Sequence, residues 1–342
     1  MTNPRPITRA MVAWILTSAI MLTCCSSPSS PAQSPQPAEQ DPATQAAPES
    51  QTAPETQTTP AGQVTVSYLG PEGTYTQEAC ELFFDGQGTY LPQADVAASV
   101  QAVVDGTSTY AVIPQENTIG GPVAEYLDEV ISHDDVSVVG EVELPISQNL
   151  LAKPGTALDG IKTVYSHKQG LAQGKAWLRD NLPNAELVEV SSTAEGARMA
   201  AEAEAGDCAA IGSSAAAGVY GLEVVAADIQ MSDTNKTRFY VLSTQEPAQE
   251  ASDRMALVAT GAANDLPALL AKAQEQGLTI IGVHDRPEKT ELGRYHYLIE
   301  CAGGGYEQFA ALQKDCPLTL RYLGSFAVRT PQESAEELAE AA

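Results

Sequence analysis

The sequence predicts a mixed α/β protein, in which two lobes face a cleft and a smaller βαββαβ domain follows. Strand-like and helix-like segments alternate over 64–244, which is typical of α/β folds with mainly parallel sheets. After a linker at 246–253 the pattern restarts in the order found in ferredoxin-like domains. Residues 26–63 contain no leucine, isoleucine, valine or aromatic residue, so we expect the folded body to begin at Val64.

The individual elements follow from hydrophobic periodicity and from glycine and proline boundaries. Strands of the two lobes are predicted at 64–70, 109–114, 136–144, 161–167, 185–192, 208–214 and 237–244. Helices are predicted at 73–84, 96–106, 121–132, 170–182 and 193–207, with Pro122 near the start of the third. In the small domain, strands are predicted at 255–261, 278–287, 294–303 and 318–327, and helices at 265–277 and 306–316.

The charge of the chain restricts its partners. Its 342 residues include 44 acidic and 18 basic side chains, a formal net charge of −26. Such a charge repels phosphate backbones and argues against a nucleic-acid partner. An anionic ligand would have to be held by local dipoles or by a few well-placed cations. The cysteines and histidines form no Cys-x-x-Cys pair and no common cluster, so no metal site is predicted.

The N-terminus has the features of an export signal. Arg5 and Arg9 precede an apolar run at 10–22 that is too short to span a membrane comfortably. The run ends in Leu-Thr-Cys-Cys, which resembles a bacterial lipoprotein signal with Cys25 as the lipid acceptor. Residues 1–25 are therefore expected to be the signal.

The segment 26–63, rich in proline, serine and glutamine, is expected to be a disordered, semi-stiff tether. Signal, acceptor cysteine and tether together predict an extracytoplasmic protein anchored to the membrane through an N-terminal lipid. Three alternatives stay open: a signal that is only cleaved, an uncleaved anchor, and translation from Met21, which would give a cytoplasmic protein.

Glycines and polar residues follow two early strands, where ligands bind in open α/β sheets. In YLGPEGTYTQEA, Gly70 and Gly73 precede a helix whose N-terminus attracts anions. In IPQENT, a polar cluster at 115–118 follows a strand directly. The alternative interpretation is an ordinary turn or helix cap in each case.

Three later segments repeat this pattern. YSHKQGLAQ at 165–173 and VSSTAEGA at 190–197 are strand-to-helix junctions, in which serine and threonine are also good helix caps. In NKTRFYVLS, Thr237 and Arg238 begin a strand. An arginine can bind a carboxylate through two hydrogen bonds while a neighbouring hydroxyl donates another, although an arginine on an edge strand can also be a plain surface residue.

Taken in order, LGPEGTYTQEA, PQENT, YSHKQGLAQ, SSTAEGA and TRF resemble the prephenate dehydratase family. The resemblance covers 64–246 and implies a two-lobed fold like that of type 2 periplasmic binding proteins, with the active site between the lobes. It implies conversion of prephenate to phenylpyruvate, water and carbon dioxide in phenylalanine biosynthesis. It implies neither a metal nor an organic cofactor.

The resemblance also assigns roles. Thr237 would be the catalytic hydroxyl, Arg238 a carboxylate partner and Glu116 an acid or orienting group. The substrate-binding residues would be Gly73, Thr74, Asn117, Thr118, Ser166, Gln169, Ser192, Thr193 and Phe239. The chain departs from the usual family pattern at Gln115, where an aliphatic residue is usual, and at Lys168, where proline is usual.

Residues 253–330 resemble the regulatory ACT domain of this family, and 331–342 would be an acidic tail. The resemblance implies L-phenylalanine as an allosteric effector, bound between paired domains of a homodimer or higher homo-oligomer. The effector residues would be Pro267, Ala268, Leu269, Asp285, Arg286 and Pro287. Pro267 stands where the family usually has a glycine.

A second class of function stays open. Because prephenate is made in the cytosol, export of this enzyme is unexpected. A non-catalytic lipoprotein could instead bind an aromatic or dicarboxylate solute in the same cleft. Thr237 beside Arg238 favours catalysis, since a solute-binding protein has no need of that hydroxyl. Export would also expose Cys301 and Cys316 to oxidation, and the sequence leaves their pairing open.

Overall fold

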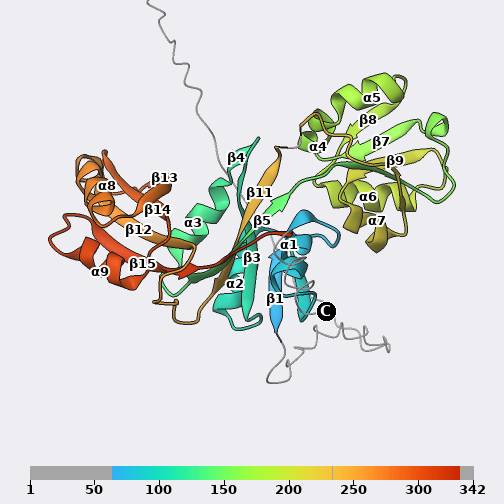
Figure 1. Ribbon diagram of the computed structural model, residues 1–342. Coiled ribbons are helices and arrows are strands. Elements are labelled where there is room, and N and C mark those ends of the chain that lie inside the picture. Colours follow the sequence, from blue (N-terminus) through green and yellow to red (C-terminus); the bar gives the residue numbers. More distant parts are fainter. Residues whose placement is uncertain (1–63, 233, 332–342) are drawn as a thin grey trace, which may run out of the picture. The chain divides into compact units, whose positions relative to one another are not determined.

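The computed structural model describes residues 64–232 and 234–331 (Figure 1). The predicted signal with Cys25, the tether, and the acidic tail beyond residue 331 lie outside the described residues. The described chain forms two α/β lobes and a smaller C-terminal domain.

The first lobe is a sheet with the order β16-β5-β11-β3-β1-β2, in which β4 pairs with β3. Its strands are β1 (Thr65–Leu69), β2 (Thr89–Gln93), β3 (Tyr110–Asn117), β4 (Gly121–Pro122), β5 (Ser137–Pro145), β11 (Lys236–Ser243) and β16 (Val328–Arg329). Its helices are α1 (Tyr75–Phe83), α2 (Val96–Val104) and α3 (Ala124–Ser132). Helix α1 packs on the cluster around Val66 and Val112, whereas α2 and α3 pack on the cluster around Ile113 and Tyr240. The sheet is therefore covered on both faces.

The second lobe has the sheet order β10-β6-β9-β7-β8. Its strands are β6 (Asn149–Ala152), β7 (Thr163–Ser166), β8 (Glu186–Glu189), β9 (Cys208–Gly212) and β10 (Glu223–Ala226). Its helices are α4 (Lys168–Gln173), α5 (Lys175–Asn181), α6 (Thr193–Glu202) and α7 (Ser214–Tyr220), with a short 3-10 turn η1 (Leu158–Gly160). The chain enters this lobe after β5 and leaves it before β11, so two crossings join the lobes.

The expectation of mainly parallel sheets needs correction, because the strands next to the crossings run the other way. β11 is antiparallel to both β3 and β5, and β6 is antiparallel to β9 and β10. The parallel pairs are β1 with β2 and β3, β7 with β8 and β9, and β16 with β5. A strand that returns from the opposite lobe enters at the far end of the sheet, which reverses its direction.

Several predicted helices differ in their boundaries from the observed helices, and the one predicted at 193–207 ends at Glu202. The helix expected at 170–182 is two helices, divided at Gly174, where an added Cβ would lie 3.1 Å from Ile211 Cδ1 and 3.3 Å from Ile229 Cδ1. Pro122 lies in β4, before α3, whose first turn follows Val123. Pairing with Glu116 extends the chain at this proline.

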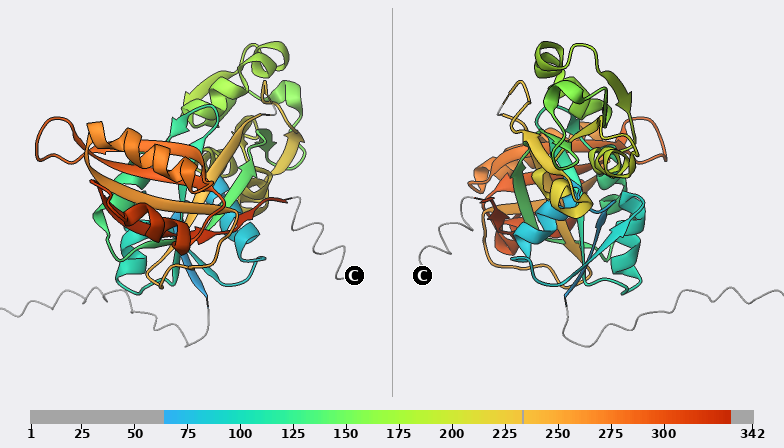
Figure 2. Two further views of the ribbon diagram at one scale, coloured as in Figure 1. Left: turned by 60° about the vertical axis from the view of Figure 1, so that its left-hand side comes forward. Right: turned by 90° about the vertical axis from the view of Figure 1, so that its right-hand side faces the viewer.

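The small domain has the predicted βαββαβ order. Its strands are β12 (Arg254–Ala262), β13 (Thr279–Pro287), β14 (Arg294–Ala302) and β15 (Thr319–Phe326), and its helices are η2 (Ala263–Asp265), α8 (Leu266–Glu275) and α9 (Tyr306–Gln313). They form an antiparallel sheet with the order β13-β14-β12-β15, with α8 and α9 on one face (Figure 2). The other face joins the first lobe's core through Val258, Leu298 and Phe326. Cys301 and Cys316 are both unpaired.

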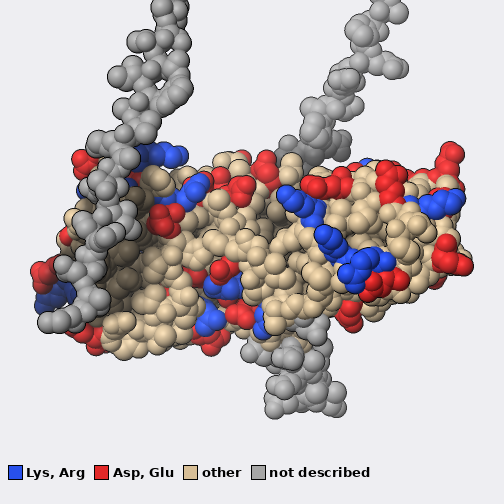
Figure 3. All heavy atoms as spheres, turned by 90° about the horizontal axis from the view of Figure 1, so that it is seen from above, with Lys and Arg blue, Asp and Glu red and all other residues tan. Residues whose placement is uncertain are grey.

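Charged side chains of both signs are interspersed on the face of the molecule drawn in Figure 3, and uncharged atoms cover most of it. None of the helices among the described residues has the length and apolar character needed to cross a bilayer.

Helix α1 carries a carboxyl group whose titration should change stability. Burial, reinforced by the negative charge of Glu81, raises the pKa of Glu78 from 4.5 to about 7. The folded protein therefore holds a proton there that the unfolded chain releases, and stability falls as pH rises from about 5 to about 8.

We expect Glu78→Gln to remove this loss of stability at higher pH, because the glutamine amide carries no charge. In urea unfolding, the free energy of unfolding of the variant should exceed that of the original protein by about 1–3 kcal/mol at pH 8 and by much less at pH 5. Glu204→Gln, at an exposed loop position, is the control for replacing one glutamate by glutamine. A constant difference between Glu78→Gln and the original protein across this range would contradict the prediction.

Candidate functional site

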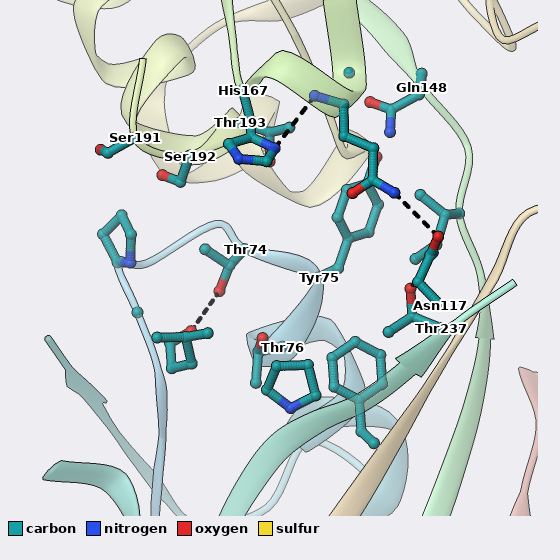
Figure 4. Close-up of a pocket in the computed structure, with 18 of the residues that line it drawn as sticks. Thr74, Tyr75, Thr76, Asn117, Gln148, His167, Ser191, Ser192, Thr193 and Thr237 are labelled. Atoms are coloured by element: carbon teal, nitrogen blue, oxygen red, sulfur yellow. Dashed lines mark hydrogen bonds between the residues drawn. The ribbon is translucent and has the colours of Figure 1, made fainter. Parts of the chain in front are cut away.

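A cavity of about 390 Å³ lies between the two lobes (Figure 4). Residues of β1, α1, β3 and β11 line it from the first lobe, and residues at the start of α4 and α6 line it from the second. Of the predicted site residues, those that line it are Thr74, Asn117, Gln169, Ser192, Thr193, Thr237 and Phe239. Five segments that lie far apart in the sequence therefore meet in one place.

Thr237 is held at the cavity wall by Asn117. The two residues are directly opposite each other on β11 and β3, and Asn117 Nδ2 donates a hydrogen bond to Thr237 Oγ1 at 2.9 Å. Because the hydroxyl oxygen accepts this bond, its hydrogen is free to be donated elsewhere. Thr237 and Phe239 both line the cavity, since alternate residues of a strand share one face.

Asn117 also links the two lobes. Its Oδ1 accepts hydrogen bonds from the backbone N–H groups of Ile119 and Gly120 at 3.0 and 2.8 Å, and from Gln169 Nε2 at 3.1 Å. A Cβ on Gly120 would lie 2.9 Å from Gln169 Nε2, so the turn after β3 has room for this contact only with glycine. The amide of Asn117 is thus fixed at both ends.

Three further polar residues belong to the site, and the sequence analysis did not identify them. Gln173 Oε1 accepts hydrogen bonds from Gln148 Nε2 and from Asn235 Nδ2, each at 3.0 Å. Asn235 Oδ1 accepts in turn from Asn117 Nδ2 at 2.8 Å. Gln173 lies one helical turn after Gln169, and this spacing is the sequence signal that could have revealed it.

Gln148 has an acceptor available within the site. Its side chain is buried, and its Oε1 has no hydrogen-bond partner among the described residues.

Tyr75, also on the wall, donates its hydroxyl to the backbone oxygen of Ser147 at 2.6 Å, and burial raises the pKa of Tyr75 well above its usual value. Tyr75 is therefore uncharged at neutral pH.

Helices α1 and α6 begin at the cavity. Thr74 caps α1 by accepting from the backbone N–H of Gln77, and Ser192 caps α6 by accepting from that of Glu195 at 2.9 Å. The positive ends of both helices therefore meet at this cavity. None of the described residues that line the cavity is a lysine or an arginine. A negatively charged ligand would be held here by helix dipoles and neutral donors.

Three predicted substrate-binding residues do not line the cavity. Ser166 is buried and donates its hydroxyl to the backbone oxygen of Ile211 at 2.8 Å. Thr118 donates to the backbone oxygen of Thr234 at 2.9 Å, which secures the turn below the site. Gly73 packs on Ala216 of α7.

The expectation that Arg238 binds a substrate carboxylate in this cavity is corrected by its position. Arg238 neighbours Thr237 on β11, so its side chain points to the opposite face of the sheet. There it bonds Glu141 and Glu300, at 2.6 and 2.8 Å from Nη2. Glu116 lies on the same face, 3.5 Å from Arg238 Nη1, and does not line the cavity either.

The predicted effector residues divide between surface and core. Pro267, Ala268, Asp285 and Pro287 are exposed, whereas Leu269 is buried among the residues of the small domain's core. Arg286 is bonded to Asp128 of α3 through Nε at 2.6 Å. Leu269 lies on the core-facing side of α8, so in this structure it cannot contact a ligand at the surface.

Among the described residues, no three or more histidine, cysteine or acidic side chains are grouped so that they could hold a metal ion.

Comparison with known proteins gives three results. The family described as prephenate dehydratase matches residues 66–247. The bifunctional chorismate mutase/prephenate dehydratase of Neisseria gonorrhoeae is 37% identical over 242 residues, 70% of this chain and 67% of the relative. The prephenate dehydratase of Mycolicibacterium gilvum is 32% identical over 284 residues, 76% of this chain and 90% of the relative.

Among solved structures, a prephenate dehydratase from Arthrobacter aurescens in complex with L-Phe is similar over 81% of this chain and 99% of its own. The TM-score is 0.69 and the sequence identity 28%.

Proposed function

This chain belongs to the prephenate dehydratase family, and on that premise we propose how its cavity carries out the reaction. The protein is a hydro-lyase that converts prephenate to phenylpyruvate in aromatic amino acid biosynthesis. The ring carboxylate leaves as carbon dioxide, and the electron pair of the broken C–C bond enters the ring. The C–O bond to the ring hydroxyl breaks at the other end, and the departing oxygen takes up one proton to become water.

We propose that the Thr237 hydroxyl donates a hydrogen bond to the departing ring oxygen, while solvent supplies the proton that completes the water molecule. The main support is the hydrogen bond from Asn117 Nδ2 to Thr237 Oγ1. Because the threonine oxygen accepts this bond, the hydroxyl hydrogen is left to be donated to the substrate. A donor placed where negative charge develops lowers the barrier more than it strengthens substrate binding. Phe239 beside it offers an apolar surface to the ring.

The two carboxylates of prephenate are assigned to neutral donors. Backbone N–H groups at the start of α1, after Thr74, and at the start of α6, after Ser192, supply positive dipole ends on two sides of the cavity. Gln169 is a further donor at the wall. This arrangement explains how a chain with a net charge of −26 can bind a dianion.

The test is to incubate the purified full-length chain with prephenate and to follow phenylpyruvate by its ultraviolet absorbance in alkali. An enzyme forms phenylpyruvate with one carbon dioxide released per turnover. The alternative, a protein that only binds a solute in this cavity, would bind prephenate in calorimetry and form no product.

We also propose that the small domain is an ACT domain that binds L-phenylalanine. The βαββαβ order and the L-Phe complex of the Arthrobacter aurescens relative support this. Of the residues implied by the resemblance, Pro267, Ala268 and Asp285 are exposed and available to a ligand or to a second copy of the chain.

Isothermal titration of the full-length chain with L-phenylalanine should give saturable binding heat, and sedimentation should show a homodimer or larger assembly. Tryptophan is the control ligand, because its larger ring requires a wider site. Absence of heat with L-phenylalanine would contradict the assignment.

We further propose an extracytoplasmic location with a lipid on Cys25. This proposal is supported by the sequence alone, through its basic start, apolar run and cysteine.

A further inference from the structure

A buried ion cluster joins the small domain to the strand that carries Thr237. It lies on the face of the first sheet opposite the cavity. Arg238 of β11 donates from Nε and Nη2 to Glu141 of β5 at 2.9 and 2.6 Å. From Nη1 and Nη2 it donates to Glu300 of β14 at 3.3 and 2.8 Å. One guanidinium thus makes two forked contacts, one within its own lobe and one to the small domain.

The cluster is shielded from water. The Glu141 side chain is 0% exposed, that of Glu300 1%, and that of Arg238 16%. Tyr240, two residues after Arg238 and on the same face, donates its hydroxyl to Glu300 as well. A low local dielectric strengthens these bonds and makes each position sensitive to the loss of a partner.

The small domain leaves room for this contact. A Cβ on Gly282 of β13 would lie 2.9 Å from Glu300 Oε2, so a larger residue there would displace the carboxylate. Glu300 can extend to β11 because Gly282, its neighbour on β13, has no side chain in the way.

We propose that Glu300 is a positioning residue for the dehydration: through Arg238 it fixes β11 so that the Thr237 hydroxyl meets the departing oxygen. This inference rests on the function proposed above. Arg238 and Thr237 are consecutive, so a change in how the guanidinium is held moves the backbone that carries the hydroxyl. Displacements of about 1 Å at a reacting group can cost about 100-fold in rate.

The variant Glu300→Gln tests this with little change in side-chain shape, and thermal unfolding of the variant checks that it is folded. It keeps the side-chain shape and leaves the Arg238–Glu141 pair intact. It also removes one charge from a cluster with more carboxylates than guanidinium groups. We expect kcat for phenylpyruvate formation to fall about 10- to 100-fold with KM changed by less than about twofold.

The matched control is Glu143→Gln. Glu143 of β5 pairs with Arg254 of the small domain at 3.3 Å, so it joins the same two parts of the chain without bonding a β11 side chain. Its kcat should stay within about twofold of the original value. An equal fall in kcat for both variants would show a general effect of loosening the small domain and overturn the inference.

A second measurement asks whether Glu300 acts through Thr237. In a Thr237→Ala background, adding Glu300→Gln should change the residual rate by less than about twofold, because the group being positioned is gone. The same 10-fold loss in both backgrounds overturns the inference. An active original protein with an unaffected Glu300→Gln variant overturns the inference alone. An original protein without turnover overturns the proposed function and the inference together.

Discussion

Thr237→Ala is expected to lower kcat by about 10²- to 10⁴-fold, the range in which a positioned proton or hydrogen-bond donor contributes to a transition state. The reason is that the departing ring oxygen loses its hydrogen-bond donor while the helix N-termini that hold the carboxylates stay in place. The measurement is steady-state phenylpyruvate formation over a range of prephenate concentrations. The free energy of unfolding should change by only about 1 kcal/mol, since one hydrogen bond is lost.

Thr237→Ser is the matched control, because it keeps the hydroxyl and the bond from Asn117 but loses the methyl group. Its kcat should lie within about 10-fold of the original value, since a less restricted rotamer weakens alignment without removing the donor. Equal kcat values for the alanine and serine variants would contradict a role for the hydroxyl.

Asn117→Ala is expected to have the second-largest effect, about 10²-fold or more in kcat/KM. This residue donates to Thr237, accepts from Gln169 of the other lobe and holds the turn at Ile119 and Gly120. Its removal leaves the threonine hydroxyl without the donor that orients it and deletes one hydrogen bond between the lobes. Kinetics with prephenate, accompanied by thermal unfolding to confirm a folded variant, would measure the loss.

Thr118→Ala serves as the control for this variant. Thr118 adjoins Asn117, donates to the backbone oxygen of Thr234 and accepts from the backbone N–H of Lys236 in β11, yet it does not line the cavity. Its effect on kcat/KM should remain below about 10-fold, because the two neutral hydrogen bonds that are lost hold the turn and neither involves a cavity-lining side chain. If Thr118→Ala were as damaging as Asn117→Ala, the specific role of Asn117 would be lost.

The residues that sequence could identify are those at the ends of strands and the beginnings of helices. Asn117, Gln169, Ser192 and Thr237 lie at or next to the ends of predicted elements, and all four line the cavity. Local signals suffice there, because the topology of open α/β sheets places such junctions together.

The sequence was misleading at Arg238, and the reason is geometric. Adjacent residues on a strand face opposite sides, so Thr237 and Arg238 cannot both line one cavity from β11. The pairing of Arg238 with Glu300 joins positions 62 residues apart and has no local signal. Gln148 and Asn235 were missed for a related reason: both flank the crossings between lobes, and only the folded structure brings them beside Gln173.

The short strands β6 and β10 were missed as well. Each has four residues, and β6 is fully buried, so it lacks the alternation by which half-buried strands are recognised. These two strands can pair only after the chain has crossed to the second lobe, and no local sequence pattern predicts that crossing.

In this mechanism the Thr237 hydroxyl acts on bound prephenate in the chemical step. The most direct test is to titrate prephenate into Thr237→Ala by calorimetry and then to follow product formation from that complex in a single turnover. We expect a dissociation constant within about threefold of the KM of the original protein and a rate of phenylpyruvate formation at least about 100-fold slower. Product formation at the original rate from the bound variant would contradict it.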